Sequence, residues 1–322
     1  MIQKERTKPR KLYFFEALLR RFLADNPKIT VIEPAKSRVE AGYLGEQRID
    51  YYLNFLPEKD YYIFHDLHLF NGKFHFQIDT LIITSTYILV IEIKNMNGEL
   101  DFHENSGQLI QKKDNIQNGY DDPLLQAEFQ VRQLKELLLK NHFPELPFEY
   151  LVMIANPNFI LNLTKSSKAQ NRVCRGHLLV KRIEALTKKY QLEKLTPEKI
   201  RKMSKCLLKN HTEPSITIEN YHISRGEIQT GVHCPDLCVL GMTYNRGKWT
   251  CPKCGYISKD AHLFALQDYF LLFGPSITNL QFREFLHLSS DDIANKMLRK
   301  LNLPYTGKNK QRIYQLSWKN IL

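Results

Sequence analysis

The chain contains 322 residues, 43% of them hydrophobic, which is enough for two or three domains with apolar cores. It has neither a signal peptide nor a run near the roughly 18 apolar residues of a membrane span, which predicts a cytoplasmic protein without a membrane partner. The net charge of +12 and the pI near 9.3 favour a polyanionic partner such as nucleic acid.

Residues 1–37 are expected to form a basic arm followed by an amphipathic helix. The arm is rich in Lys and Arg, and apolar residues at helical spacing come next. These are Lys4, Arg6, Lys8, Arg10 and Lys11, then Leu12, Phe15, Leu18, Leu19 and Phe22. Two roles stay open for this segment, contact with nucleic acid or packing on a neighbouring domain.

A second helix is predicted from about Gly42, with Ile49 and Leu53 on its apolar stripe. Glu46 falls on that same stripe, which is an unusual place for an acid. One interpretation is a favourable interaction of a first-turn glutamate with the helix dipole. The other is a role for Glu46 in a metal site.

Extended segments follow the second helix. Residues 61–69 and 73–78 are interpreted as strands joined at Asn71-Gly72, a strong turn signal. Residues 81–84 and 87–94 are interpreted as a hairpin centred between Ser85 and Thr86, although those residues make a poor two-residue turn. In this hairpin, positions whose numbers sum to 171 face each other.

This register places Asp79 opposite Glu92, with Lys94 beside both because alternate side chains share a face of a strand. Two carboxylates at cross-strand distance repel each other, and apolar strands need a cation to compensate them. A divalent metal held by Asp79 and Glu92, with Lys94 near a substrate phosphate, satisfies this arrangement. From the spacing alone, a hairpin with a solvated charged end stays an equal alternative.

After the hairpin, Asn97-Gly98 leads into one or two further strands over residues 99–111. Asp122 and Pro123 then start a helix. Gln126, Gln130 and Gln133 share one face of that helix, which is most simply a solvated surface. Residues 151–155 supply another strand, and this order of elements predicts an α/β core with a mixed sheet.

Several of these residues resemble a known family. Asp79 followed by Glu92-Ile93-Lys94 resembles the PD-(D/E)XK nuclease signature, with Gln77 where that signature has a loosely kept Pro. The upstream Gly42-Tyr43-Leu44-Gly45-Glu46 and the downstream Asp122-Pro123-Leu124-Leu125-Gln126 make residues 38–155 similar to the nuclease-related domain called NERD.

The resemblance implies a restriction-endonuclease-like mixed sheet flanked by helices over residues 38–165. It implies Asp79 and Glu92 as ligands of Mg²⁺ or Mn²⁺, and Lys94 as the group that positions the nucleophile or stabilises the developing charge. It also implies that Glu46 and Gln126 are further members of the site.

Residues 166–225 form a basic helical segment. Positions 165–209 hold 14 Lys and Arg against 3 Glu, a surplus of 11 that is close to the whole net charge. Helical patterns cover residues 179–190, which would finish the core, and 200–208, interpreted as a bridge. The candidate phosphate contacts are Lys181, Arg182, Lys188 and Lys189. A solvated helical face is the alternative.

Four cysteines indicate a metal site within residues 226–262. Cys234 and Cys238 form one close pair, and Cys251 and Cys254 form the other, which resembles a zinc ribbon. A closed four-thiolate shell around Zn²⁺ stabilises a fold and does no chemistry. His233 is then a bystander. Two disulfides are the alternative, which a reducing cytoplasm disfavours.

Residues 263–322 resemble a winged helix-turn-helix. The pattern predicts helices over 280–288 and from Ser290 to about Leu301, then a basic hairpin over 307–316. The candidate nucleic-acid contacts are Lys296, Arg299, Lys300, Lys308, Lys310 and Arg312. A protein-docking module is the competing interpretation.

The leading functional hypothesis is a metal-dependent nuclease that hydrolyses phosphodiester bonds in DNA. The alternative is a non-cleaving nucleic-acid-binding or sensing protein, which would bind in a salt-sensitive way without cleavage. The joint presence of Asp79, Glu92 and Lys94 favours the nuclease, because a binding platform has no use for so costly a cluster.

Overall fold

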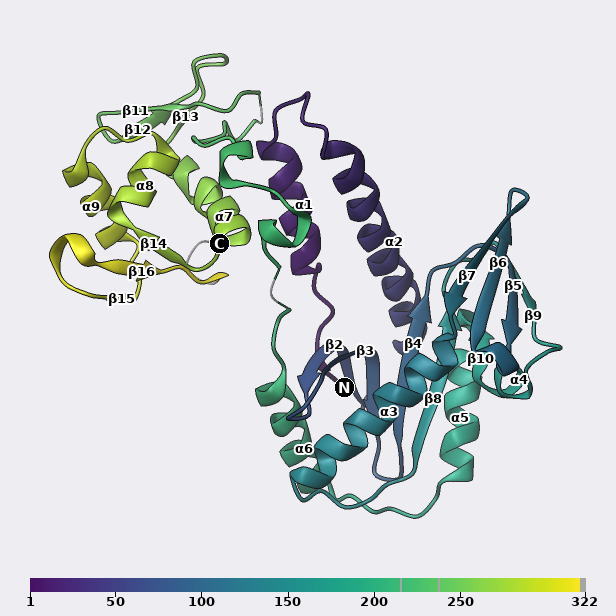
Figure 1. The fold of residues 1–322 in the computed structure, drawn as a ribbon. Helices are drawn as coiled ribbons and strands as arrows, with labels where there is room; N and C mark the ends of the chain where they lie inside the picture. Colours follow the sequence, from purple (N-terminus) through teal and green to yellow (C-terminus); the bar gives the residue numbers. More distant parts are fainter. Residues whose placement is uncertain (215, 237, 319–322) are drawn as a thin grey trace. The chain divides into compact units, whose positions relative to one another are not determined.

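The computed structural model describes residues 1–214, 216–236 and 238–318, without the side chain of Lys310. The chain divides into two compact units (Figure 1). The first unit comprises Met1–Lys8 and Glu40–Pro214, and the second comprises Pro9–Val39 and Ser215–Leu322. The five segments expected from the sequence stay a prediction. In the described part, none of the helices has the length and apolarity needed to cross a membrane.

The first unit is built on a six-stranded mixed sheet of order β1-β2-β3-β4-β8-β10. Its strands are β1 (Ile2–Lys4), β2 (Tyr62–Phe70), β3 (His75–Ile83), β4 (Ile88–Lys94), β8 (Phe148–Ile154) and β10 (Val173–Arg175). β2, β3 and β4 pair antiparallel, whereas β1, β8 and β10 join their neighbours in parallel. This confirms the predicted α/β class with a mixed sheet.

Helices cover both faces of this sheet (Figure 1). α3 (Pro123–Lys140) and α6 (Pro197–Asn210) share one apolar cluster with β2, β3 and β4. α2 (Ile29–Leu53) and α5 (Leu179–Lys189) pack on the opposite face. The interpretation of the second basic helix as a bridge is wrong, because Ile200, Met203 and Leu207 of α6 are buried in the core.

The central hairpin has the predicted register. Thr80 pairs with Ile91 and Ile83 with Ile88, so paired positions sum to 171. The turn at Ser85-Thr86 uses no positive φ. It is closed by Thr84, whose Oγ1 accepts hydrogen bonds from the amides of Thr86 at 3.2 Å and Tyr87 at 2.9 Å. The two strand segments predicted over 73–84 are one continuous strand, β3.

A second sheet, of order β7-β6-β5-β9, also belongs to the first unit. Its strands are β5 (Gly98–His103), β6 (Gln108–Lys113), β7 (Ile116–Asp121) and β9 (Phe159–Asn162), with α4 (Ser167–Arg172) after them. The expectation of one or two strands over residues 99–111 is confirmed, because β5 and β6 lie there. β7 was missed because every one of its residues is exposed, so it has no apolar alternation.

Residues 261–315 of the second unit have the order of elements of a winged helix-turn-helix. These elements are α7 (Ala261–Phe273), β14 (Ser276–Thr278), α8 (Asn279–Leu286), α9 (Asp291–Lys300), β15 (Tyr305–Thr306) and β16 (Ile313–Gln315). The sheet order is β14-β16-β15, and Ser290 caps α9 as predicted. The helix α1 (Arg10–Arg21) and a small sheet within residues 243–258 also belong to this unit. Five short 3-10 helices complete the described chain, at Glu104–Ser106, Gly176–Leu178, Ile218–Tyr221, Arg225–Glu227 and Asn309–Gln311.

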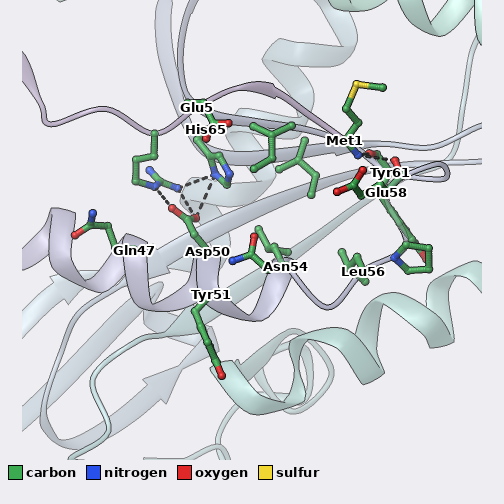
Figure 2. Close-up of a pocket in the computed structure, with 15 residues that line it drawn as sticks. Met1, Glu5, Gln47, Asp50, Tyr51, Asn54, Leu56, Glu58, Tyr61 and His65 are labelled. Atoms are coloured by element: carbon green, nitrogen blue, oxygen red, sulfur yellow. Dashed lines mark hydrogen bonds and ion pairs between the residues drawn. The ribbon is translucent and has the colours of Figure 1, made fainter.

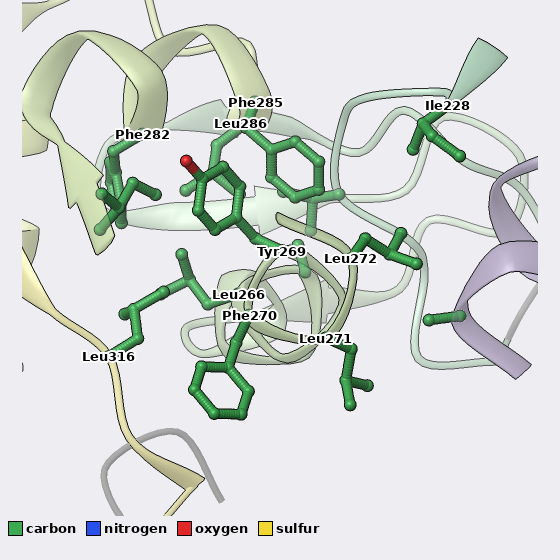
Figure 3. Packing of buried hydrophobic residues seen from close by; sticks show 14 of the residues in the cluster. Ile228, Leu266, Tyr269, Phe270, Leu271, Leu272, Phe282, Phe285, Leu286 and Leu316 are labelled. Atoms are coloured by element: carbon green, nitrogen blue, oxygen red, sulfur yellow. The ribbon is translucent and has the colours of Figure 1, made fainter. Parts of the chain in front are cut away.

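The core of this unit combines α7 and α8 with the N-terminal helix α1. Figure 3 shows Tyr269 of α7 beside Phe285 of α8, and their ring centroids are 5.2 Å apart. Phe14, Phe15 and Leu18 of α1 are fully buried in the same cluster. Of the two roles left open for the N-terminal helix, the structure therefore shows packing.

A buried ion-pair cluster fastens α1 to α7. The Arg21 Nε lies 2.7 Å from Asp268 Oδ2, and both side chains are fully buried. Arg20 Nη2 reaches the other oxygen at 2.5 Å and is 21% exposed. Because removal of one buried partner leaves an uncompensated charge, this cluster depends on the fully buried pair of Arg21 and Asp268.

We expect Asp268→Asn to destabilise the second unit by about 3–5 kcal/mol, because Arg21 would keep its charge without a partner. Arg20→Gln should cost about 1 kcal/mol or less, since Arg20 is partly hydrated. Urea unfolding of the full chain measures both changes. Equal effects of the two substitutions would contradict this account.

Candidate active site

Asp79 lies where both hydrogen-bond ladders of β3 are interrupted. The β2–β3 pairing omits Asp66 and Asp79, with Asp66 at φ 51°, and the β3–β4 pairing ends at Thr80. The Oδ2 of Asp79 instead accepts a hydrogen bond from the Ile93 amide at 2.8 Å. This bond closes the gap where β3 and β4 part, and it fixes the carboxyl group there.

The structure brings Glu92 and Lys94 to the same place. Glu92 is 2% exposed and Asp79 is 9% exposed. Burial and the negative charges of Glu92 and Glu46 raise the pKa of Asp79 well above its ordinary value. Lys94 Nζ lies 2.7 Å from Glu92 Oε1. The buried carboxyl groups therefore have one lysine beside them.

Helix α3 supplies two glutamines, one turn apart. Gln126 Oε1 accepts a hydrogen bond from Lys94 Nζ at 2.8 Å, and Gln130 Nε2 donates one to Glu92 Oε2 at 2.7 Å. The solvated-surface interpretation of this glutamine face is wrong for Gln130, which is 5% exposed. Its spacing of four residues from Gln126 was the signal that could have found it.

Glu46 reaches the site from α2. This helix begins at Ile29, so Glu46 is not in its first turn, and the helix-dipole interpretation is wrong. Burial, followed by nearby carboxylates, raises the pKa of Glu46 to about 7, although Arg6 opposes the shift. α2 can approach because Gly45 has no side chain. A Cβ on Gly45 would lie 2.6 Å from the Cβ of Asn95.

Arg6, from the N-terminal segment of the first unit, contacts several of the residues around these acids. Its side chain is 4% exposed and forms an ion pair with Glu46 and a 2.6 Å ion pair with Asp50. It also donates hydrogen bonds to the Asp79 carbonyl and to Thr80 Oγ1, both at 2.9 Å. No local pattern links Arg6 to residues forty or more positions away, so sequence reasoning could not find it.

A cavity of about 700 Å³ adjoins Arg6 in the first unit, between the N-terminal segment, α2 and β2. Figure 2 shows Asp50 and His65 side by side at one end of it. Burial lowers the pKa of His65 to about 4, so its imidazole is neutral.

The oxygen atoms of Asp79 and Glu92 are ligands of the kind that hard divalent cations take. Glu46 does not complete a tight trio with them. Among the described residues, only four cysteines of the second unit form a group of three or more potential ligands that all lie within 4.8 Å. Glu46 forms an ion pair with Arg6, so it lies beside the site of Asp79 and Glu92 without being a ligand of a tight group.

Residues 41–155 match the family model described as NERD, nuclease-related domain. This part of the chain is a nuclease-related domain. No curated protein and no solved structure matches the chain. The matched segment of the NERD domain contains Glu46, Asp79, Glu92, Lys94 and both glutamines of the site, whereas Arg6 precedes it.

The basic residues predicted on α5 differ in their surroundings. Lys181 and Lys188 are exposed. Lys189 Nζ lies 2.9 Å from Oε1 of the buried Glu149, and Arg182 is half-buried. Lys189 therefore neutralises the buried Glu149, whereas Lys181 and Lys188 are exposed cations of this helix.

The predicted basic residues of the second unit are mostly exposed. The exposed ones are Lys296, Arg299, Lys300 and Lys308. The Arg312 guanidinium lies 4.1 Å from the centroid of the Tyr305 ring and is half-buried. The Lys310 side chain lies outside the described residues.

The four predicted cysteines come together in the second unit, beside the small sheet β11 (Thr243–Asn245), β12 (Lys248–Thr250) and β13 (Ile257–Ser258). Three pairs of their Sγ atoms lie 3.4–3.7 Å apart. Four thiolates about 2.3 Å from one ion at tetrahedral angles lie about 3.8 Å apart. The cluster is compatible with a zinc ribbon, and His233 lies outside the group.

We expect Gly45→Ala to destabilise the NERD domain by about 1–3 kcal/mol, because the added methyl group overpacks α2 against Asn95. Gly42→Ala is the matched control. A Cβ there meets nothing within 4 Å, so it should stabilise the same helix by about 0.4–1 kcal/mol. Chemical unfolding of the full chain measures both free energies, and a stabilising Gly45→Ala would contradict the close approach.

Proposed function

We propose that the protein is a divalent-metal-dependent nuclease that hydrolyses phosphodiester bonds in DNA. The observation that carries the proposal is the contact set of Asp79, Glu92 and Lys94 at the parting of β3 and β4, completed by Gln126 and Gln130. The NERD match supports the same reaction class.

Asp79 and Glu92 would hold Mg²⁺ or Mn²⁺. The donor set fits, because two buried carboxyl groups supply oxygen ligands and their mutual repulsion calls for a cation. When bound, such an ion supplies Lewis-acid polarisation of the phosphoryl group and a more acidic water. Gln130 holds the second oxygen of Glu92 and so fixes the orientation of that carboxylate.

Lys94 would act on the substrate. Its ammonium group is held between Glu92 and Gln126, and its side chain is 28% exposed, so it can donate a hydrogen bond to a phosphate oxygen or to the attacking water. A fixed cation at this point stabilises the negative charge that develops in the transition state. Arg6 and Glu46 would position the acids from the other side.

The exposed cations would hold the phosphate backbone without reading the sequence of bases. We assign this role to Lys181 and Lys188 on α5 and to Lys296, Arg299 and Lys300 on α9. α9 takes the place of a recognition helix in the winged-helix order. A protein partner for this C-terminal module is the competing role.

We also propose Zn²⁺ as the ion of the four-cysteine cluster. A closed thiolate shell stabilises the fold and needs reduced cysteines, which fits a cytoplasmic protein.

The nuclease proposal is tested by cleavage of supercoiled, linear and single-stranded DNA and of RNA, with Mg²⁺, Mn²⁺ or EDTA. Asp79→Asn and Lys94→Ala should each lower the rate on DNA by about 10²-fold or more, because one removes a metal ligand and the other a charge-stabilising donor. Lys202→Ala, on an exposed α6 side chain, should cleave normally.

Binding without metal-dependent cleavage by the wild type would contradict the nuclease proposal and favour the binding platform. Cleavage that persists in Asp79→Asn would place the chemistry elsewhere. Far-ultraviolet circular dichroism of each variant controls for folding.

For the cysteine cluster, we expect about one Zn²⁺ per chain in the wild type and its loss in Cys234→Ser, with a lower melting temperature. Cys206→Ser is the control, because Cys206 belongs to α6 of the first unit. Elemental analysis and thermal melts measure these effects. Full zinc retention in Cys234→Ser would contradict the assignment.

A further inference from the structure

A cavity of about 520 Å³ lies beside the candidate active site in the first unit. This volume falls within the range of roughly 300–1,000 Å³ for small-ligand pockets. The cavity is walled by α3, by β3 and by the turns before α3. Gln126 and Gln130 line it and also contact Lys94 and Glu92. A substrate group next to the reacting phosphate therefore has a space to enter.

The lining of the cavity has the chemistry of a neutral, planar ligand. Phe76, Leu125 and Phe129 provide apolar surface, and glutamines provide amide groups at positions 77, 126, 130 and 133. None of these described lining residues is Lys, Arg or His, while Asp121 and Asp122 carry negative charge. A phosphate would be repelled here, whereas an uncharged ring with hydrogen-bonding edges fits.

Gln130 adds a specific hydrogen-bond acceptor. Its Nε2 must face Glu92, because a carboxylate only accepts hydrogen bonds, and this fixes the orientation of the amide. The opposite atom, Oε1, is buried and has no hydrogen-bond partner among the described residues. A buried acceptor without a donor is unfavourable, so a ligand N–H group would complete it.

Phe129 offers a surface for stacking. It is 61% exposed, although exposure of a phenylalanine side chain to water is unfavourable. It lies one position before Gln130 on α3. Aromatic side chains bind single-stranded nucleic acids by stacking on any base.

We propose that this cavity binds an unpaired nucleobase next to the phosphodiester that is cut, so the substrate is single-stranded DNA or the unpaired end of a duplex. The base stacks on Phe129 and donates an N–H to Gln130 Oε1. In a duplex, both the face and the edge of the base are already occupied, so a paired base must first leave the stack. This inference rests on the proposed nuclease function.

The test uses the full chain without added Mg²⁺ or Mn²⁺, so that binding is measured apart from cleavage. The probe is a single-stranded deoxyoligonucleotide that contains the fluorescent base 2-aminopurine. We expect its fluorescence to fall on binding, and Phe129→Ala to remove that change and to weaken binding by about 5- to 150-fold. Leu139→Ala, on the same helix, 45% exposed and outside the cavity, should behave as the wild type.

A comparison with duplex DNA decides the outcome. Duplex DNA of the same length should bind Phe129→Ala and wild type equally. Equal binding of the single strand to both proteins, or an equal loss for duplex and single strand, would overturn the cavity assignment. If the binding test succeeds but the protein cleaves nothing, the nuclease proposal alone is refuted. If the protein is an active nuclease but fails the binding test, only the cavity assignment is refuted.

Discussion

The hydrogen bond from the Ile93 amide to the Asp79 carboxyl group, 2.8 Å long, is the contact on which the first unit depends. It forms where β3 leaves β4, so a sheet that is otherwise continuous opens at one point. The opening carries the buried acids Asp79 and Glu92, whose charges apolar strands cannot solvate. Lys94 and Gln130 contact Glu92, and Gln126 holds Lys94 in place. One lysine does not balance two buried carboxyl groups, so this point of the sheet favours a bound cation.

The path of the chain brings Arg6 and Glu46 close to these buried acids. Arg6 lies two residues before Lys8, the last residue of the first N-terminal segment of that unit, and Glu46 lies six residues after Glu40, where the unit resumes. The ion pair between Arg6 and Glu46 therefore joins two of the segments that lead to the second unit. In that unit, α1 is held by a buried ion pair of its own, between Arg21 and Asp268.

Much of the candidate site could be read from the sequence, because the information was local. The period of two in the hairpin fixed its register, and the Asp122-Pro123 pair marked the start of α3. Arg6 could not be found, because its partners lie forty or more residues away and the parallel pairing of β1 with β2, just before Arg6, is not a local pattern either. The burial of Gln130 could not be predicted for a different reason. A polar residue is buried where it has a hydrogen-bond partner, and the sequence does not show that Glu92 lies beside Gln130. The start of α2 was placed too late because Pro34 lies within the helix.

The most direct test of this account is calorimetric titration of Mn²⁺ into the full chain after removal of loosely bound metals. If the buried acids of the opened sheet form a cation site, the wild type binds Mn²⁺ and Asp79→Asn loses that binding while it keeps its fold. Absence of Mn²⁺ binding in the wild type, or equal binding by both proteins, would contradict the claim that this site exists to hold a metal ion.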